Sequence, residues 1–285
     1  MKTIGQVLQL SCDWLKSKSS SHSRREVEEL IAFTLKCKRL DIYLHFDKPL
    51  LEQELAKIRS NLSRLATNEP LQYIEGQVEF YGCHIMVDNR VLIPRPETEL
   101  LVDHVVKTLS TQNLQNKVLW DICTGSGCIG ISVKKSLPDL KVVLADLSKD
   151  ALQVAQENSK LNQVDLECVL GDFFTPFANQ MCDYLICNPP YISEDEYREL
   201  EPHVRDFEPK GALVANLNGL EFYERLARDS KNFVRPGGRV FLEIGQEQSE
   251  PCRKLFSTYA NLKVKKDLAG IERFIEFEIP SYSDF

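Results

Sequence analysis

The sequence predicts an α/β protein in which a small helical N-terminal domain precedes a doubly wound, mostly parallel sheet of seven strands. Two observations predict this class. Apolar residues keep helical spacing through about the first seventy residues. From residue 118 onward, short and almost continuously apolar strands alternate with helices, as in a parallel sheet covered on both faces. We expect a helical domain at 1–72, a β-hairpin linker at 73–94 and a larger domain at 95–285.

The bulk composition fits a soluble globular protein, with 43% apolar and 27% charged residues among 285. A net charge of −7 argues against nucleic-acid binding through bulk electrostatics, because such domains are usually basic. The nine Cys include no C-x2-C pair and the five His are scattered, so we expect no metal site. Without a signal peptide or a long apolar span, we expect a cytoplasmic protein that does not cross a membrane.

Three amphipathic stretches make up the N-terminal domain. The first has its apolar residues at Ile4, Val7, Leu8, Trp14 and Leu15. Ser23 and Glu26 then form a capping box ahead of the second. The third has an apolar stripe at Leu51, Leu55, Ile58, Leu62 and Leu65. Packing of the helices on one another explains these stripes, and the bundle could serve as a docking domain for a protein substrate.

The linker changes to short β-like segments at 77–81 and 84–87, with turns at Gly82 and at Asp88. These features predict a hairpin. Directly after it, Pro96 and Glu97 suit the first turn of a helix.

The larger domain then alternates strands and helices. We expect strands at 118–123, 142–146, 166–170, 184–187 and 239–244, and helices near 128–136, 148–162 and 219–233. Two last strands, at 262–268 and 273–279, are separated by a turn at Gly270 and predict an antiparallel pair at the edge of the sheet.

The first strand ends in a Gly-rich turn that opens a helix. The candidate cofactor-binding residues of this turn are Cys123, Thr124, Gly125, Ser126 and Gly127. Residues 125–130 also fit the pattern G-x-G-x-x-G, in which glycines let the backbone approach a dinucleotide. The pattern alone is weak, and a tight turn without a ligand is the alternative. The strand before it and the helix after it favour ligand binding.

Two further strand ends complete a candidate nucleoside site. Asp146 ends the second strand, where a carboxylate can accept both hydroxyls of a ribose; capping the next helix is the alternative. Asp172 and Phe173 follow the third strand, where an acid could bind an adenine amine and an aromatic ring could cover the base. A core aromatic beside a turn is the alternative. NAD and S-adenosylmethionine both carry adenosine, so these loops do not choose between them.

The loop after the fourth strand makes that choice. It contains Asn188, Pro189, Pro190 and Tyr191, and because proline has no N–H this backbone offers carbonyl acceptors. Together with the Asn amide and the Tyr ring, it forms a stiff rim suited to a planar –NH2 group. A proline-stiffened turn is the alternative. A dehydrogenase would need a proton donor or acceptor here, usually His, Tyr or Lys beside a hydride acceptor, so the loop favours methyl transfer.

These motifs together resemble the release-factor glutamine methyltransferases, and the similarity runs nearly from end to end. It rests on the segments 92–99 (LIPRPETE), 121–127, 188–191, 207–209, 212–213, 219–220 and 243–245. The Asn-Pro-Pro-Tyr motif alone also occurs in adenine-amine DNA methyltransferases and guanine RNA methyltransferases. The resemblance implies the Rossmann-like fold of class I S-adenosylmethionine-dependent methyltransferases. It also implies methyl transfer to the side-chain amide of the glutamine in the Gly-Gly-Gln loop of class I peptide-chain release factors.

The resemblance also implies roles for individual residues. Residues 123–127, Asp146, Phe173 and Asn188 match positions that contact S-adenosylmethionine, and residues 188–191 match those that hold the glutamine. Catalysis is implied for Asn188 with the Pro189 carbonyl, which would accept the two N–H groups of the amide, and for Tyr191. Many family members have Gly at the position of Cys123 and Trp at that of Phe173. Arg95 and Glu97 either line the site or form a salt bridge at the helix start.

Three other functions stay open at this stage. A related enzyme type methylates a glutamine of a ribosomal protein and shares the Asn-Pro-Pro-Tyr motif, although residues 93–99 favour the release-factor branch. A nucleic-acid amine methyltransferase is disfavoured by the net acidity, and no nucleic-acid substrate is expected. A non-catalytic scaffold is disfavoured because every expected site residue is present. We expect a monomer.

Overall fold

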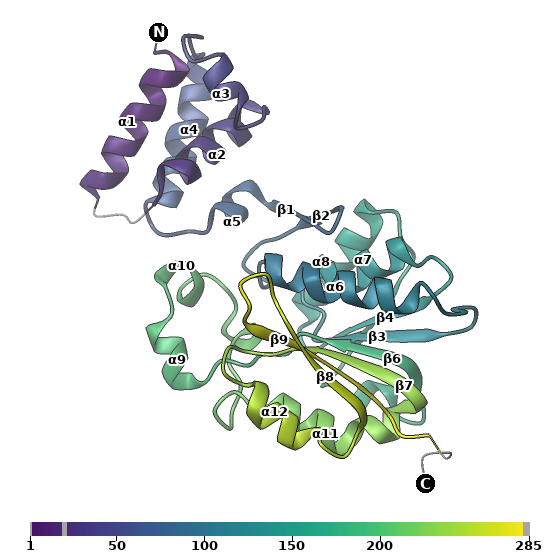
Figure 1. The fold of residues 1–285 in the computed structure, drawn as a ribbon. Helices are drawn as coiled ribbons and strands as arrows, with labels where there is room; N and C mark the ends of the chain where they lie inside the picture. The colour runs from purple at the N-terminus through teal and green to yellow at the C-terminus, as the bar shows by residue number, and fades with distance from the viewer. Residues whose placement is uncertain (1, 19–21, 282–285) are drawn as a thin grey trace. The chain divides into compact units, whose positions relative to one another are not determined.

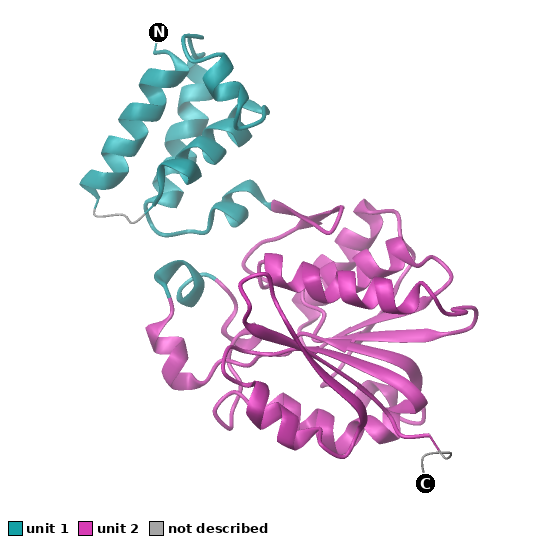
Figure 2. Ribbon diagram, in the orientation of Figure 1, with its two compact units in different colours: residues 1–76, 201–207 teal, residues 77–200, 208–285 magenta. Residues whose placement is uncertain are grey.

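The computed structural model describes residues 2–18 and 22–281 (Figure 1). The chain forms two compact units, residues 1–76 with 201–207 and residues 77–200 with 208–285 (Figure 2). Each unit is described separately. The division at 72/73 and 94/95 stays a prediction of domain boundaries, and the hairpin falls within the second unit.

The first unit is helical. Its elements are α1 (Ile4–Ser17), α2 (Arg24–Leu35), α3 (Asp41–Leu44), α4 (Glu52–Leu65), α5 (Leu71–Glu75) and α10 (Pro202–Arg205). The predicted capping box at α2 is confirmed, since Ser23 and Glu26 cap each other's backbone N–H groups, and Thr3 with Gln6 does the same at α1. The apolar stripes face a common core in which Leu8, Leu30 and Leu65 are fully buried.

The second unit begins with the predicted hairpin, β1 (Gln77–Phe80) and β2 (Cys83–Met86), which pair antiparallel. Two Asn side chains of α8 (Lys149–Leu161) and its C-cap hold β2 in place. The Asn158 Oδ1 accepts the Met86 N–H over 2.7 Å, and the Asn162 Oδ1 accepts the His84 N–H over 3.2 Å. Asn158 Nδ2 also donates to the Ser126 carbonyl over 2.9 Å, which connects the hairpin to the Gly-rich turn.

The sheet has seven strands, as predicted, and their order is β5-β4-β3-β6-β7-β9-β8. The strands are β3 (Val118–Ile122), β4 (Lys141–Asp146), β5 (Glu167–Leu170), β6 (Cys182–Cys187), β7 (Val234–Glu243), β8 (Ala260–Lys266) and β9 (Glu272–Glu278). The first five run parallel, and β9 joins β7 antiparallel. Because the chain moves outward from β3 to β5 and then returns to β6 on the other side of β3, the order reverses between β3 and β6. Ligands bind at such a switch point in open α/β sheets.

Helices cover both faces of the sheet, which confirms the doubly wound class. Figure 1 shows α6 (Pro96–Leu109), α7 (Cys128–Ser136) and α8 on one face, and α11 (Glu221–Phe233) and α12 (Ser249–Leu255) on the other. The connection from β6 to α11 contains the short helices α9 (Glu194–Glu199) and η2 (Lys210–Ala212), and η1 (Thr175–Phe177) follows β5.

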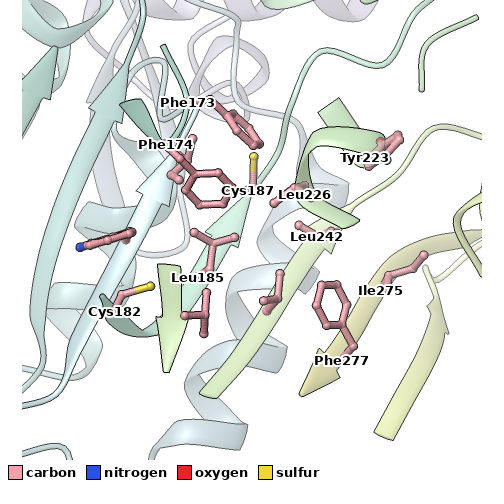
Figure 3. Packing of buried hydrophobic residues seen from close by; sticks show 14 of the residues in the cluster. Phe173, Phe174, Cys182, Leu185, Cys187, Tyr223, Leu226, Leu242, Ile275 and Phe277 are labelled. Atoms are coloured by element: carbon pink, nitrogen blue, oxygen red, sulfur yellow. The ribbon is translucent and has the colours of Figure 1, made fainter. Parts of the chain in front are cut away.

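One hydrophobic core cluster lies between the sheet and α11 with α12 (Figure 3). Aromatic rings stack within it: Trp120 on Phe177 at 3.9 Å and Phe174 on Phe233 at 4.6 Å between ring centroids. The cluster includes Phe173, beside Phe174, and Cys187, the last residue of β6. The segment after β5 and the end of β6 are therefore anchored in this core.

One strand begins earlier than the sequence indicates. The strand was predicted at 239–244, but β7 starts at Val234 and includes Pro236, Gly237 and Gly238, residue types that are depleted in regular strands. Its pairing with β6 shifts register between the pairs Cys182–Val234 and Tyr184–Arg239, so these residues form a bulge inside the strand. A Cβ at Gly238 would lie 2.6 Å from the Asp183 carbonyl oxygen, which explains a glycine there.

No helix within 2–18 or 22–281 is both long enough and apolar enough to cross a membrane.

Candidate active site

A cavity of about 310 Å³ opens at the carboxyl ends of β3, β4, β5 and β6. This volume is within the usual range for small-molecule sites, roughly 300–1,000 Å³. Of the predicted site residues, eight line it: Cys123, Thr124, Gly125, Ser126, Asp146, Phe173, Asn188 and Pro190. Gly127, Pro189 and Tyr191 do not line it. The sequence motifs of four separate strands thus meet at one place.

The Gly-rich turn follows β3 and leads into α7. Cys123, Gly125 and Gly127 all have positive φ, at 60°, 53° and 80°. The left-handed conformation suits glycine but costs about 1–2 kcal/mol for a residue with a Cβ, so Cys123 is strained. A Cβ added at Gly125 would meet no atom within 4 Å, so the space beside this backbone is open to a ligand. At Gly127 a Cβ would lie 3.0 Å from Ile131 Cδ1, which explains that glycine by packing.

Asp121, on β3, stabilises the conformation of this turn through hydrogen bonds. Its Oδ2 accepts the Thr124 hydroxyl over 2.6 Å and the Gly130 N–H over 2.9 Å. Asp121 is fully buried, and its Oδ1 makes no hydrogen bond within the described residues. Burial raises the pKa of this carboxyl to about 7, although Thr124 and Gly130 lower it.

Asp146 ends β4 and closes the other side of the turn. Its Oδ2 accepts the Gly125 N–H over 2.8 Å and its Oδ1 accepts the Ser148 N–H over 2.9 Å. Ser148 itself caps α8 by accepting the Ala151 N–H, so helix capping does not require Asp146. A carboxylate has about four acceptor sites, and two remain for hydroxyl groups of a ligand. Burial raises the pKa of Asp146 above its ordinary value.

Phe173 forms the aromatic wall of the cavity. It has φ 55° and is 4% exposed, and it packs edge-on against Phe174 at 4.8 Å. Arg225 lies 4.7 Å from the Phe173 ring centroid and forms an ion pair with Asp172 over 2.9 Å. Phe222, which also lines the cavity, lies 5.6 Å from Phe173. Asp172 is therefore partly engaged by Arg225, and Phe222 is an aromatic wall residue that sequence reasoning missed.

The Asn-Pro-Pro-Tyr loop leaves the end of β6, and its Tyr191 is clamped by two other segments. Gln248 Nε2 donates to the Tyr191 carbonyl over 2.9 Å. A Cβ at Gly219 would lie 2.1 Å from that carbonyl oxygen, and one at Gly245 would lie 3.0 Å from Tyr191 Cδ2. Both glycines fall in segments that carry the family resemblance, and close contact with Tyr191 explains their small size. Burial raises the pKa of Tyr191 well above its ordinary value.

Asn188 faces the cavity and is held by residues that sequence reasoning did not assign. Its Nδ2 lies 3.4 Å from Thr98 Oγ1, and the Thr98 hydroxyl donates to Glu243 Oε2 over 2.7 Å. Glu243 is 3% exposed, and burial raises its pKa to about 7. Thr98 lies in the first turn of α6, and Glu243 is the last residue of β7. Both lie in segments that carry the family resemblance, which was the only signal available.

Arg95 lines the cavity and pairs with Glu208 over 2.6 Å, so its partner is not the neighbouring Glu97. Glu208 is 4% exposed, and its other oxygen accepts the Ile93 N–H over 3.1 Å. This single buried carboxylate therefore ties the segment before α6 to the segment after α10. Glu97 is exposed and does not line the cavity.

These residues fit an adenosine-containing cofactor. Open backbone at Gly125, a carboxylate at Asp146 with spare acceptor sites, and the Phe173 and Phe222 rings lie around one cavity. The acceptor-rich Asn188–Pro190 corner adjoins them. The geometry alone is compatible with methyl transfer to nitrogen.

Comparison with known proteins agrees with this geometry. Two protein-family models match: "Methyltransferase small domain" over residues 96–203 and "PrmC N-terminal domain" over residues 6–76. Solved structures with the same fold include a methyltransferase from Pyrococcus furiosus (TM-score 0.52, 16% identity, 81% of this chain and 100% of that chain). Another is the catalytic domain of hMettl16 in complex with an RNA hairpin (TM-score 0.56, 16% identity, 71% of this chain and 77% of that chain). At these identities they show the fold alone.

Sequence relatives are much more similar. The release factor glutamine methyltransferase of Thermodesulfovibrio yellowstonii is 37% identical over 258 residues, which cover 89% of this chain and 91% of that protein. The enzyme of the same name from Chlamydia trachomatis serovar L2 is 36% identical over 274 residues, covering 96% of this chain and 93% of the relative. This chain belongs to the release factor glutamine methyltransferase family.

Proposed function

We propose that this protein transfers a methyl group from S-adenosylmethionine to the side-chain amide nitrogen of the glutamine in the Gly-Gly-Gln loop of class I release factors. The observation that carries the proposal is the position of the Asn188 amide. It lines the same cavity as Gly125, Asp146 and Phe173, so a nucleoside site and the hydrogen-bonding amide of Asn188 share one space. Family membership supports the choice of substrate.

Residues of this chain divide the binding of the cofactor among them. Asp146 would accept the ribose hydroxyls, Phe173 and Phe222 would flank the adenine, and the turn at 123–127 would approach the remainder of the molecule. When bound, S-adenosylmethionine supplies an electrophilic methyl group on a positively charged sulfur. Asp146 lines the cavity, and the buried carboxyls of Asp121 and Glu243 lie near the ends of β3 and β7; their ionised forms would favour such a cation.

The hydrogen-bond acceptors of the Asn-Pro-Pro-Tyr loop would increase the reactivity of the substrate amide. A carboxamide nitrogen is a poor nucleophile because its lone pair is delocalised into the carbonyl group. If Asn188 Oδ1 and the Pro189 carbonyl accept its two N–H groups, the nitrogen becomes more electron-rich and is held in one orientation. The role of Tyr191, whose ring would face the sulfonium or the glutamine amide, stays a prediction because Tyr191 does not line the cavity. We also propose that the enzyme acts as a monomer in the cytoplasm, where release factors work.

One experiment tests the substrate. Purified protein is mixed with methyl-labelled S-adenosylmethionine and either a release factor or the same factor with its loop glutamine changed to alanine. We expect label in the first factor and none in the second. Equal label in both would refute the choice of glutamine.

Two further samples address the other candidate substrates. Ribosomal proteins and bulk RNA receive the same treatment. Preferential labelling of a ribosomal protein would indicate that the enzyme is of the related type that methylates a ribosomal-protein glutamine. Preferential labelling of RNA would indicate a nucleic-acid amine methyltransferase. Either result would replace the release factor as the substrate.

A further inference from the structure

Asn188, Thr98 and Glu243 form one hydrogen-bonded chain although they come from three separate elements. Asn188 follows β6, Thr98 lies in the first turn of α6 and Glu243 is the last residue of β7. The two contacts join residues that are 90 and 145 positions apart in the sequence. Thr98 is 2% exposed and Glu243 is 3% exposed. Thr98 lines the cavity together with Asn188, and the buried Glu243 carboxylate, which does not line it, lies behind Thr98.

When Glu243 is ionised, the hydrogen bonds that link Asn188, Thr98 and Glu243 can have only one donor-to-acceptor direction. A carboxylate has no hydrogen to donate, so the single hydroxyl hydrogen of Thr98 is donated to Glu243. The Thr98 oxygen is then left as an acceptor toward Asn188. Only the NH2 end of the Asn188 amide can donate to it, and Glu243 accepts from the same side chain. The opposite end, Oδ1, makes no hydrogen bond to any part of the chain that the structure describes.

We propose that Thr98 and Glu243 are positioning residues that fix the orientation of the Asn188 amide, so that Oδ1 faces the substrate as an acceptor. The inference rests on the proposed function for the identity of that substrate, a carboxamide whose N–H group must be accepted. Neither residue needs to touch the reacting atoms. They act by excluding the alternative orientation of Asn188.

The excluded orientation has the wrong polarity. An amide turned by half a rotation would present its NH2 group to the NH2 group of the glutamine, and two donors cannot form a hydrogen bond with each other. The glutamine nitrogen would lose the acceptor that enriches it and would no longer be held in place. Because the 3.4 Å contact between Asn188 and Thr98 is long for a hydrogen bond, the polarity of the partners matters more than the strength of that bond.

The ionisation state of Glu243 decides which orientation is held. The groups that interact electrostatically with it are Glu97 of α6, Arg273 of β9, Tyr191 of the loop, Tyr223 of α11 and Cys128 of α7. Burial raises the pKa of Glu243 to about 7, while Thr98, Arg273 and Asn188 lower it and Glu97 raises it. When protonated, Glu243 can donate a hydrogen bond to Thr98. The Thr98 hydroxyl can then donate to Asn188, which favours the orientation in which Asn188 Oδ1 faces Thr98 and not the substrate. The productive orientation is therefore lost on acidification.

Three variants of the full-length protein test the inference with a release factor as substrate. Thr98→Val keeps the volume and removes the hydroxyl, Thr98→Ser restores it, and Thr108→Val makes the same change at another Thr of α6. We expect Thr98→Val to lower kcat roughly ten- to hundredfold, as misplacement of a reacting group does. KM and the calorimetric Kd for S-adenosylmethionine should change less than about threefold. Thr98→Ser should recover most of the loss, and Thr108→Val should match the native protein.

Glu243→Gln supplies a second test that does not depend on how Thr98→Val folds. Gln can donate or accept toward Thr98 at any pH, so we expect a lower kcat and the loss of the acid limb of the native kcat profile near pH 7. A kcat within twofold of the native value in Thr98→Val and Glu243→Gln would overturn the inference, as would equal losses in Thr98→Val and Thr98→Ser. If the native protein labels no release factor, the proposed function fails instead. These outcomes separate the two ideas.

Discussion

The Gly125 N–H donates to the Asp146 carboxylate over 2.8 Å, which joins the turn after β3 to the end of β4. The same carboxylate is proposed to bind the ribose, so the backbone of the turn and the ligand would both be held by Asp146. Loss of this carboxylate should weaken cofactor binding more than it destabilises the fold, because Ser148 caps α8 independently.

We therefore expect Asp146→Ala to raise the Kd for S-adenosylmethionine roughly ten- to hundredfold, since hydrogen bonds to a charged group contribute about 1.5–3 kcal/mol each. Isothermal titration calorimetry measures this directly. Asp150→Ala is the matched control, because it removes an acid from the first turn of α8, four residues further along, without touching the cavity. Unchanged affinity in Asp146→Ala would remove Asp146 from the cofactor site.

Asn188→Ala should nearly abolish methyl transfer, with a loss of at least about a hundredfold in kcat, because it removes a preorganised group that acts at the reacting nitrogen. S-adenosylmethionine should still bind measurably, since Asp146 and Phe173 are untouched. Single-turnover labelling of a release factor and calorimetry check the two statements. Intact binding with an undiminished rate would show that Asn188 has no catalytic role.

Gly219→Ala should lower kcat without contacting the substrate. Its Cβ would lie 2.1 Å from the Tyr191 carbonyl oxygen and 2.6 Å from Gln248 Nε2, so the Asn-Pro-Pro-Tyr loop must shift. Gly270→Ala is the matched control: Gly270 has φ 82°, against 83° for Gly219, and its Cβ would meet no atom within 4 Å. Both variants should lose stability on the order of 1 kcal/mol from the left-handed conformation. Only Gly219→Ala should lose rate, and equal kcat values would contradict the role of this clamp.

Glu243→Gln should stabilise the fold at alkaline pH although it impairs transfer. The folded pKa of about 7 lies above the ordinary value of 4.5, because burial disfavours the charged form. The folded state then binds more protons than the unfolded state between about pH 4.5 and 7, so the contribution of Glu243 to stability falls as pH rises through that window. Replacing it should raise the free energy of unfolding at pH 8 by on the order of 2 kcal/mol, with little change near pH 4.5.

Urea unfolding at pH 4.5 and pH 8 measures this difference. Glu276→Gln is the control of opposite sign. Burial also acts on Glu276, but His104 and Arg239 outweigh it and lower its pKa, so its loss should destabilise the protein at pH 8. A Glu243→Gln protein that is less stable than the native one at pH 8 would indicate a purely structural carboxylate.

Short-range patterns predicted most of the fold. Helix α7 at Cys128–Ser136 and the alternation of strands with helices follow from local apolar runs and from the turns between them. The early start of β7 was missed because Pro236 and Gly237 suggest a turn, and only pairing with β6 converts them into a bulge. Helix α12 was missed because Pro251 stands inside it and the segment is short. In both cases, tertiary packing overrides the local preference of proline and glycine for turns.

The position of a residue at the cavity was predictable where it directly follows a strand, as for Asn188. It was not predictable where the chemistry depends on two distant segments, as for Thr98 with Glu243 or Ile93 with Glu208. Each of these residues lay inside a recognised motif, but a motif does not state which partner its side chain meets. These side-chain partners are brought together only when α6 and the segment before it pack against the sheet.

The pKa values of Asp121 and Glu243, both raised by burial to about 7, have a consequence for proton balance. A bound cation favours the ionised form of each carboxyl, so uptake of S-adenosylmethionine near pH 7 should expel protons into the buffer. Calorimetry in buffers of different ionisation enthalpy would count them. The demethylated product lacks the charge on sulfur, so protons should return to the carboxyls after transfer. The buried acids would thereby hold the charged methyl donor more firmly than the spent one.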